Sequence, residues 1–254
     1  PRFPELSGYA LSQTDVNVEE VAALDPQVVL TSSRSEWLDV IQTLGIDVVA
    51  FEGESPELLK DSMLITGAML GPNALARAEA WVEYFDTVFA DVVAVTSELD
   101  ADELVRVLFT GTDALRVASG QMYQTAMIEA AGGISVSDSL RGFWNDVNLE
   151  QVLLWQPDVI FVPPYGGASV EAITESSGWQ IIDAVQEGRG YLLPKLGAPC
   201  DTPVPDSALG IIWMANILYP GLVDYDCETE VTTFYQTFYD YDVTAEELSR
   251  LCAW

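Results

Sequence analysis

The sequence predicts an α/β protein of two parallel-sheet lobes that one long α-helix joins. Sixteen residues starting at Asp15 recur without a gap from Asp146, with seven identities, which indicates two related halves. Strand and helix patterns alternate in both halves, as they do in parallel sheets. Between the halves, a helical pattern with apolar residues at i, i+3 and i+4 runs from Asn73 to about Thr96. We expect this helix to join the lobes.

Each copy of the repeat has the pattern of a short helix followed by a strand. Asn17 and Asn148 are placed to cap the helices, and Glu20 or Gln151 follows three residues later, as in a capping box. A proline then ends each helix, because the residue before proline disfavours the helical conformation. The β-branched run after it is too apolar for a half-exposed sheet, so we expect both strands to be buried on both faces.

The remaining elements follow from apolar periodicity and from Gly and Pro positions. The first half is expected to have a strand at 27–31, a helix ending near Leu44, a strand at 46–51 and a helix at 57–70. Before the second repeat copy, the second half is expected to have a strand at 105–109, an extended piece at 114–118 and a helix at 121–131. After that copy we expect helices at 169–176 and 179–184, a strand at 190–194, a helix at 206–218 and a terminal helical pair. The expected domains are an N-terminal lobe at 1–72, a linking helix at 73–98 and a C-terminal lobe at 99–254.

The composition excludes several classes of protein. Forty Asp and Glu face ten Lys and Arg, a net charge of −30, so the surface repels nucleic acid and anionic lipid. The complete absence of histidine excludes His-based catalysis and His metal ligands. No phosphate-loop or dinucleotide-binding glycine motif is present, and no apolar run reaches the ~18 residues of a membrane helix. The chain opens at Pro1 without a methionine, which we interpret as processing or trimming.

The three cysteines leave two interpretations open. Cys200, Cys227 and Cys252 form no C-x-x-C pair, so a zinc site of thiolates is not supported. Either Cys227 and Cys252 form a disulfide and leave one free thiol, or all three are buried and inert.

Candidate ligand-binding residues lie in the loops that follow the predicted strands, because ligands of parallel α/β sheets bind beyond the carboxyl ends of the strands. Cations are scarce in this chain, so three of them in such loops indicate an anionic ligand or a metal chelate, with aromatic rings covering its apolar parts. The alternative is that these cations only pair with some of the forty carboxylates. The candidates are Tyr9, Arg34, Trp37, Tyr123, Arg141, Trp144, Tyr165 and Lys195; no catalytic residue and no metal ligand is predicted.

Glu19 and Glu150 occupy the same position in the first turn of the two repeat helices. An acidic side chain there complements the helix dipole, which alone could account for both. As a matched pair, one in each lobe, they also suit recognition by a two-fold symmetric partner.

With these features the chain resembles the substrate-binding proteins of ABC importers for ferric siderophores, haem and vitamin B12, the class III periplasmic binding proteins. The resemblance rests on the repeat, the long helix, Ala131-Gly132-Gly133 before the second copy and Trp155-Gln156-Pro157-Asp158-Val159-Ile160 within it, and it covers essentially the whole chain. It implies ligand held between two lobes, no catalysis, and docking of Glu19 and Glu150 onto arginines of a membrane permease. Family members usually begin with a further strand and helix that are missing here, so we expect a smaller N-terminal lobe.

The resemblance implies an extracytoplasmic receptor, in the periplasm or lipid-anchored on the outer face of the membrane, that delivers an iron(III)-siderophore-like complex to an ABC permease. The chelate is cargo, and no cofactor is expected. The lack of histidine argues against zinc and manganese receptors and removes an axial haem ligand. The alternatives are a corrinoid or haem receptor of the same family, an enzyme on the same scaffold, and a ligand-free sensor or scaffold.

Overall fold

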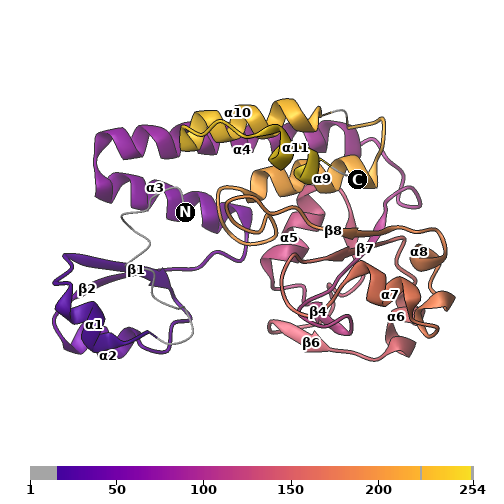
Figure 1. The fold of residues 1–254 in the computed structure, drawn as a ribbon, viewed down its shortest axis with the longest axis horizontal. Coiled ribbons are helices and arrows are strands. Elements are labelled where there is room, and N and C mark those ends of the chain that lie inside the picture. Colours follow the sequence, from indigo (N-terminus) through magenta and orange to yellow (C-terminus); the bar gives the residue numbers. More distant parts are fainter. Residues whose placement is uncertain (1–15, 224, 253–254) are drawn as a thin grey trace. The chain divides into compact units, whose positions relative to one another are not determined.

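The computed structural model describes residues 16–223 and 225–252, so Tyr9 lies outside the described residues. The chain divides after Gly53 into two compact units, and most of their helices and strands are labelled in Figure 1. The smaller unit holds the first repeat copy, and the larger unit holds the second copy together with the long helix. The predicted lobe boundaries at residues 72 and 98 stay a prediction.

The smaller unit has a two-stranded parallel sheet with two short helices. Its elements are α1 (Val18–Ala23), β1 (Val28–Ser32), α2 (Leu38–Thr43) and β2 (Asp47–Phe51). Asn17 caps α1 as predicted, because its side-chain oxygen accepts hydrogen bonds from the main-chain nitrogens of Glu19 and Glu20 at 3.0 and 3.3 Å. The prediction of burial on both faces was wrong for β1, whose residues are half-buried or exposed. Among the described residues β1 has one strand partner, β2, so it lacks the cover of a central strand.

Two consecutive helices open the larger unit, α3 (Pro56–Leu70) and α4 (Pro72–Thr96). Gly71 alone separates them, with a φ of 104° that a glycine adopts without strain. The helices pack closely along their lengths (Figure 1). A Cβ at Gly67 of α3 would lie 2.9 Å from the Cβ of Ala78 on α4, so Gly67 is what permits this approach. The predicted long helix is confirmed, and its role as a linker stays a prediction.

A parallel sheet of four strands in the order β5–β3–β7–β8 organises the rest of the larger unit. Strand β7, from the second repeat copy, is buried along its whole length, as predicted. The sequence did not predict β5, which has only two residues. The strands are β3 (Arg106–Phe109), β5 (Ile134–Ser135), β7 (Val159–Val162) and β8 (Gly190–Leu192).

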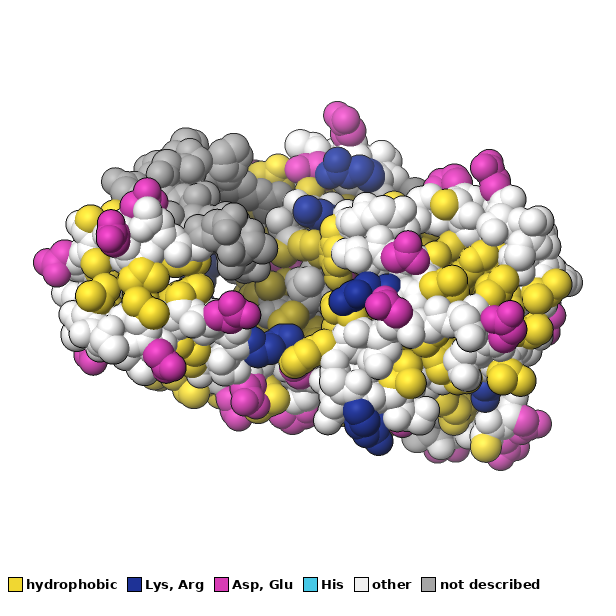
Figure 2. Space-filling model, turned by 90° about the horizontal axis from the view of Figure 1, so that it is seen from below, with side chains coloured by type: hydrophobic (Ala, Val, Ile, Leu, Met, Phe, Trp, Pro, Cys, Tyr) yellow, Lys and Arg dark blue, Asp and Glu magenta, His cyan; other side chains and the backbone are white. Residues whose placement is uncertain are grey.

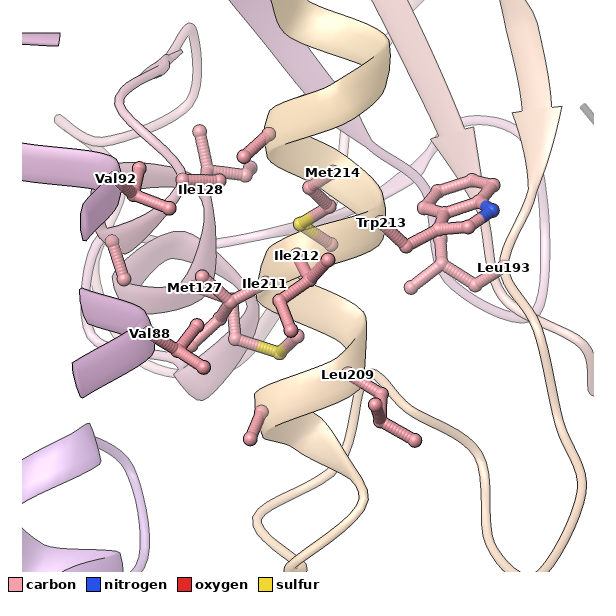
Figure 3. Close-up of a cluster of buried hydrophobic side chains, with 14 of the residues drawn as sticks. Val88, Val92, Met127, Ile128, Leu193, Leu209, Ile211, Ile212, Trp213 and Met214 are labelled. Atoms are coloured by element: carbon pink, nitrogen blue, oxygen red, sulfur yellow. The ribbon is translucent and has the colours of Figure 1, made fainter. Parts of the chain in front are cut away.

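Hydrophobic clusters cover both faces of this sheet, because side chains alternate along each strand. Val107 and Phe109 of β3 belong to one cluster, and Leu108 between them belongs to the other. The first cluster centres on α9 (Ser207–Leu218), in which every residue except Asn216 is buried. Figure 3 shows side chains of α9 beside those of α4 and of α5 (Tyr123–Ala130), with Trp213 beside Leu193.

Short helices form the second cluster on the opposite face of the sheet. The single helix predicted at 179–184 is split into a 3-10 turn and a short α-helix, because Ile182 between them is extended, with ψ 127°. These elements are α6 (Leu149–Trp155), α7 (Val170–Glu175), η2 (Trp179–Ile181) and α8 (Asp183–Gln186).

An antiparallel pair outside the main sheet was not predicted. Strand β4 (Arg116–Ala118) pairs with β6 (Trp144–Asp146), which the sequence had placed in a ligand-side loop. That prediction was wrong because a three-residue strand shows too little alternation to be recognised, and its pairing depends on residues distant in sequence.

The chain closes with the predicted helical pair, α10 (Cys227–Tyr239) and α11 (Ala245–Leu251). A disulfide joins Cys227 to Cys252, and Cys200 is a free, buried thiol, so the first of the two cysteine interpretations is confirmed. Among the helices of residues 16–223 and 225–252, none is both long and apolar enough to cross a bilayer.

Candidate ligand-binding site

The loops at the carboxyl edge of the four-stranded sheet are tied to one another. The main-chain oxygen of Thr112, after β3, accepts hydrogen bonds from the nitrogens of Gly167 and Ala168, after β7, at 2.8 and 3.0 Å. Gly166 has a φ of 86°, and a Cβ there would lie 2.6 Å from the Cα of Thr112. Only glycine permits both this conformation and this approach. Hydrogen bonds and close packing therefore hold these two loops together at the edge where parallel sheets bind ligands.

Arg141 presents a cation on this edge. It lies in the loop between β5 and β6 and is exposed. Its Nη1 donates to the main-chain oxygens of Asp138 and Leu140 at 2.7 and 2.9 Å, which orients the guanidinium group. The residue after Arg141 is Gly142, and its main-chain oxygen accepts a hydrogen bond from the hydroxyl of Ser119 at 2.5 Å. The loop thus holds Arg141 in a defined position.

The half-buried Trp144 lies at the start of β6, which pairs with β4. Its ring packs against Gly111, where a Cβ would lie 2.8 Å from Cε3 of the indole. The neighbouring Phe143 is 44% exposed. The two aromatic residues therefore differ, because Trp144 is held by packing and Phe143 is exposed.

Tyr165 bonds to a buried carboxyl that the sequence had not singled out. Its hydroxyl donates to Oδ2 of Asp201 at 2.5 Å, and Asp201 has no exposed surface. Nε2 of Gln124 donates to the main-chain oxygen of Asp201 at 2.9 Å. Burial raises the pKa of Tyr165, and the nearby Asp201 raises it further. Asp201 falls in the long loop after β8 that the sequence marked as ligand-side, but nothing in the sequence tied it to Gln124.

Two further candidates differ in how much surface they offer. Tyr123 is fully buried, and its hydroxyl lies 2.7 Å from that of Ser207. Burial also raises the pKa of Tyr123. Lys195 is exposed, and its backbone bridges to Pro199. The ligand-binding roles of both residues stay a prediction, and Tyr123 presents no side-chain surface to solvent.

The smaller unit has its own candidates after β1. Arg34 is exposed, and its main-chain nitrogen lies 3.3 Å from the hydroxyl of Ser32. Trp37 is half-buried and precedes α2 directly. Each unit therefore presents an arginine at the carboxyl edge of its own sheet. On the face drawn in Figure 2, Lys and Arg side chains are few and lie apart among acidic and apolar ones.

The matched glutamates Glu19 and Glu150 are both exposed in the first turn of their helices, α1 and α6. Asn148 caps α6 by accepting from the nitrogen of Gln151 at 2.8 Å. Both glutamates are thus accessible for docking, and their role stays a prediction. Within the described ranges, no three His, Cys, Asp or Glu side chains are grouped to hold a metal ion.

A parallel-sheet α/β chain with exposed, polar loops at the carboxyl edge of the sheet has the features of a protein that binds a small solute. It belongs to the family described as periplasmic binding protein, which matches its residues 10–196. The protein is therefore an extracytoplasmic solute-binding component of an ABC transporter, and such components pair with a permease.

Related proteins agree with this assignment. The molybdate-binding protein MolA of Haemophilus influenzae is 31% identical over 97% of this chain and 77% of its own length. The structure of MolA bound to molybdate aligns with 27% identity over 96% of this chain and 82% of MolA, with a TM-score of 0.81. A periplasmic solute-binding protein of Veillonella parvula is 26% identical over 98% of this chain and 78% of its own, with a TM-score of 0.81.

Proposed function

We propose that this chain captures a small anionic metal species of the molybdate class and delivers it to an ABC permease. This proposal rests on the exposed Arg141, whose guanidinium group and loop are held in position by hydrogen bonds. Nη1 is held by two main-chain oxygens, and the other guanidinium nitrogens have no partner among the described residues. A guanidinium group that is oriented in advance binds an oxyanion well, because its fork of N–H donors matches two anion oxygens.

The aromatic side chains of the larger unit support a small ligand. Tyr123 is buried, Trp144 packs on Gly111, and the hydroxyl of Tyr165 is bonded to Asp201. These three side chains offer little open aromatic surface to the apolar body of a large chelate. The similarity to MolA, a molybdate-binding protein, supports the same substrate class.

An iron(III)-siderophore complex is the second candidate. The exposed ring of Phe143, two residues from Arg141, favours it, because an aromatic face beside a cation suits an anionic chelate with apolar parts. A corrinoid or haem is the next alternative. We propose that the protein releases its ligand chemically unchanged, because the sequence predicts no catalytic residue.

Isothermal titration calorimetry against molybdate, a ferric siderophore, haem and cobalamin tests the proposal, with sulfate as a matched dianion. We expect molybdate to bind at least about 100-fold more tightly than sulfate, a difference of roughly 2.7 kcal/mol. Saturable binding of the siderophore without binding of molybdate would replace the first candidate by the second. Turnover of any ligand would instead support an enzyme.

A further inference from the structure

Asp201 is a buried carboxyl, and one of its oxygens has no hydrogen-bond partner within residues 16–223 and 225–252. It lies in the loop between β8 and α9 and has no exposed surface. Oδ2 accepts the hydroxyl of Tyr165 at 2.5 Å. Oδ1 is buried without a hydrogen-bond partner among the described residues. An ionised carboxylate in this position would leave a charged acceptor without a donor, which is costly.

Gln124, on α5, has the same deficiency, because one of its side-chain atoms is also an acceptor that lacks a donor among the described residues. It is 5% exposed, and its Nε2 donates to the main-chain oxygen of Asp201 at 2.9 Å. Its Oε1 is a second buried acceptor without a partner in the described part of the chain. Turning the amide over would bring Oε1 against the main-chain oxygen of Asp201 and would lose the Nε2 bond. Either orientation therefore leaves this residue pair short of one donor.

The groups around Asp201 in the described part of the chain are neutral or acidic. The groups that face its carboxyl are the phenol of Tyr165 and the amide of Gln124. The preceding residue, Cys200, is a buried thiol. Asp206, which precedes α9, accepts hydroxyls from Tyr235 and Tyr239. Within the described residues no Lys or Arg forms an ion pair with Asp201, so a neutral carboxyl fits this site better than a charged one.

We propose that Asp201 carries a proton in the folded protein, donates it from Oδ1 to Oε1 of Gln124, and acts as a positioning residue for Tyr165. One proton on Oδ1 supplies the donor that this residue pair lacks, and Oε1 is the unpartnered acceptor of a side chain already bonded to the Asp201 backbone. Burial raises the pKa of the Asp201 carboxyl, and the hydrogen bonds that it receives from Tyr165, from its own backbone and from Gln124 offset this only in part. The neutral acid then holds the phenol of Tyr165 at the carboxyl edge of the sheet.

The protonation of Asp201 also affects the binding of an anionic ligand, and this part of the inference rests on the proposed function. A protein with a net charge of −30 already repels an anionic ligand. A protonated Asp201 fixes Tyr165 without adding a negative charge beneath the loop that carries it. As the pH rises and Asp201 ionises, the new charge and the unpartnered acceptors weaken both the loop and the binding of an anion.

Infrared spectroscopy of the ligand-free protein tests the proton directly. Asp201→Asn is isosteric, and its amide can donate to Gln124 and accept from Tyr165, so it imitates the neutral acid. We expect the wild-type minus D201N difference spectrum at neutral pH to show the C=O stretch of a protonated carboxyl. Asp206→Asn is the matched control, because both oxygens of Asp206 already accept phenolic hydroxyls, and its difference spectrum is expected to lack that band.

Tyr165→Phe gives an independent readout if D201N fails to fold. It removes the donor to Oδ2 and keeps the acid–amide pair, so the C=O band of a protonated Asp201 should move to higher frequency. An ionised Asp201 has no such band to move. Absence of the band in the D201N difference spectrum, or of its shift in Y165F, overturns the proposal.

Thermal stability and binding complete the test. The folded pKa of Asp201 is raised, so the stability it contributes is present at low pH and is lost as the pH rises from its unfolded value of ~3.9 through the folded value. We expect the Tm of wild type to fall across this range relative to that of D201N. The Kd for molybdate should rise about tenfold through the folded pKa in wild type and stay nearly constant in D201N. Tm profiles of wild type and D201N that run parallel with pH would overturn the proposal that Asp201 is protonated. Absence of molybdate binding in both proteins would overturn only the proposed function, because the infrared band still reports the protonation of Asp201.

Discussion

The indole ring of Trp144 packs so closely on Gly111 that a Cβ added at Gly111 would lie 2.8 Å from Cε3 of the ring. Gly111 lies in the loop after β3, and Trp144 opens β6. The contact ties the antiparallel pair β4–β6 to the carboxyl edge of the parallel sheet. The position of Trp144 therefore depends on the absence of a single methyl group.

Gly111→Ala should displace this ring. Overpacking of this kind costs about 1–3 kcal/mol, so we expect a lower Tm and a change in tryptophan fluorescence. Gly167→Ala is the matched control, because it lies on the same edge and its Cβ would meet only the main-chain oxygen of Thr112, at an ordinary 3.6 Å. Equal melting temperatures for the two variants would contradict the packing argument.

The features predictable from the sequence were those written locally in the chain. The two helix–strand copies and the Asn17 and Asn148 caps follow from short patterns that need no distant partner. The long helix α4 follows from apolar spacing over many turns. The family resemblance rested on these same local patterns, and the match to the family over residues 10–196 confirmed it.

The features that were not predictable depend on pairs distant in sequence. Gln124 bonds to Asp201 across 77 positions, and neither residue carries a pattern that names the other. The burial of Tyr123 depends on α9, which supplies Ser207. The exposure of β1 depends on how many neighbours its strand has, which periodicity does not report. Sequence reasoning therefore found the loops of the candidate site but not the contacts within them.

Removal of the disulfide should destabilise the larger unit without unfolding α10 outright. Cys227 and Cys252 close a loop with a sequence separation of 25, for which chain entropy gives about 3–4 kcal/mol. We expect Cys227→Ser with Cys252→Ser to lower the free energy of unfolding by that order in urea titrations. Cys200→Ala is the control for loss of a thiol, because Cys200 is free. A double variant as stable as wild type would show that the crosslink contributes nothing.

Loss of the Arg141 side chain should weaken ligand binding. A hydrogen bond to a charged group contributes about 1.5–3 kcal/mol, so Arg141→Ala should raise the Kd for molybdate roughly 10- to 100-fold. Arg34→Ala tests the predicted role of the smaller unit separately, and we expect it too to raise the Kd. Arg250→Ala, on α11, removes the same charge from an exposed helix and should leave the Kd nearly unchanged. Equal effects of R141A and R250A would indicate only long-range electrostatics.

Permease docking through Glu19 and Glu150 can be separated from ligand binding. Both are exposed, and both lie in first turns, at α1 and α6. Glu19→Ala with Glu150→Ala should leave the Kd unchanged and reduce uptake through the intact transporter, because charge pairs at an interface mainly affect association with the partner. The measurements are calorimetry on the purified protein and uptake of labelled molybdate in cells.

The control must reproduce the effect of these substitutions on the helices themselves, since a first-turn glutamate also stabilises its helix dipole. Glu57 on α3 and Glu171 on α7 are likewise exposed first-turn glutamates, so Glu57→Ala with Glu171→Ala makes the same change of charge and of helix stability at other sites. We expect this control pair to transport normally. If both double variants lose uptake equally, net charge or stability is responsible; if neither does, Glu19 and Glu150 are not the docking residues.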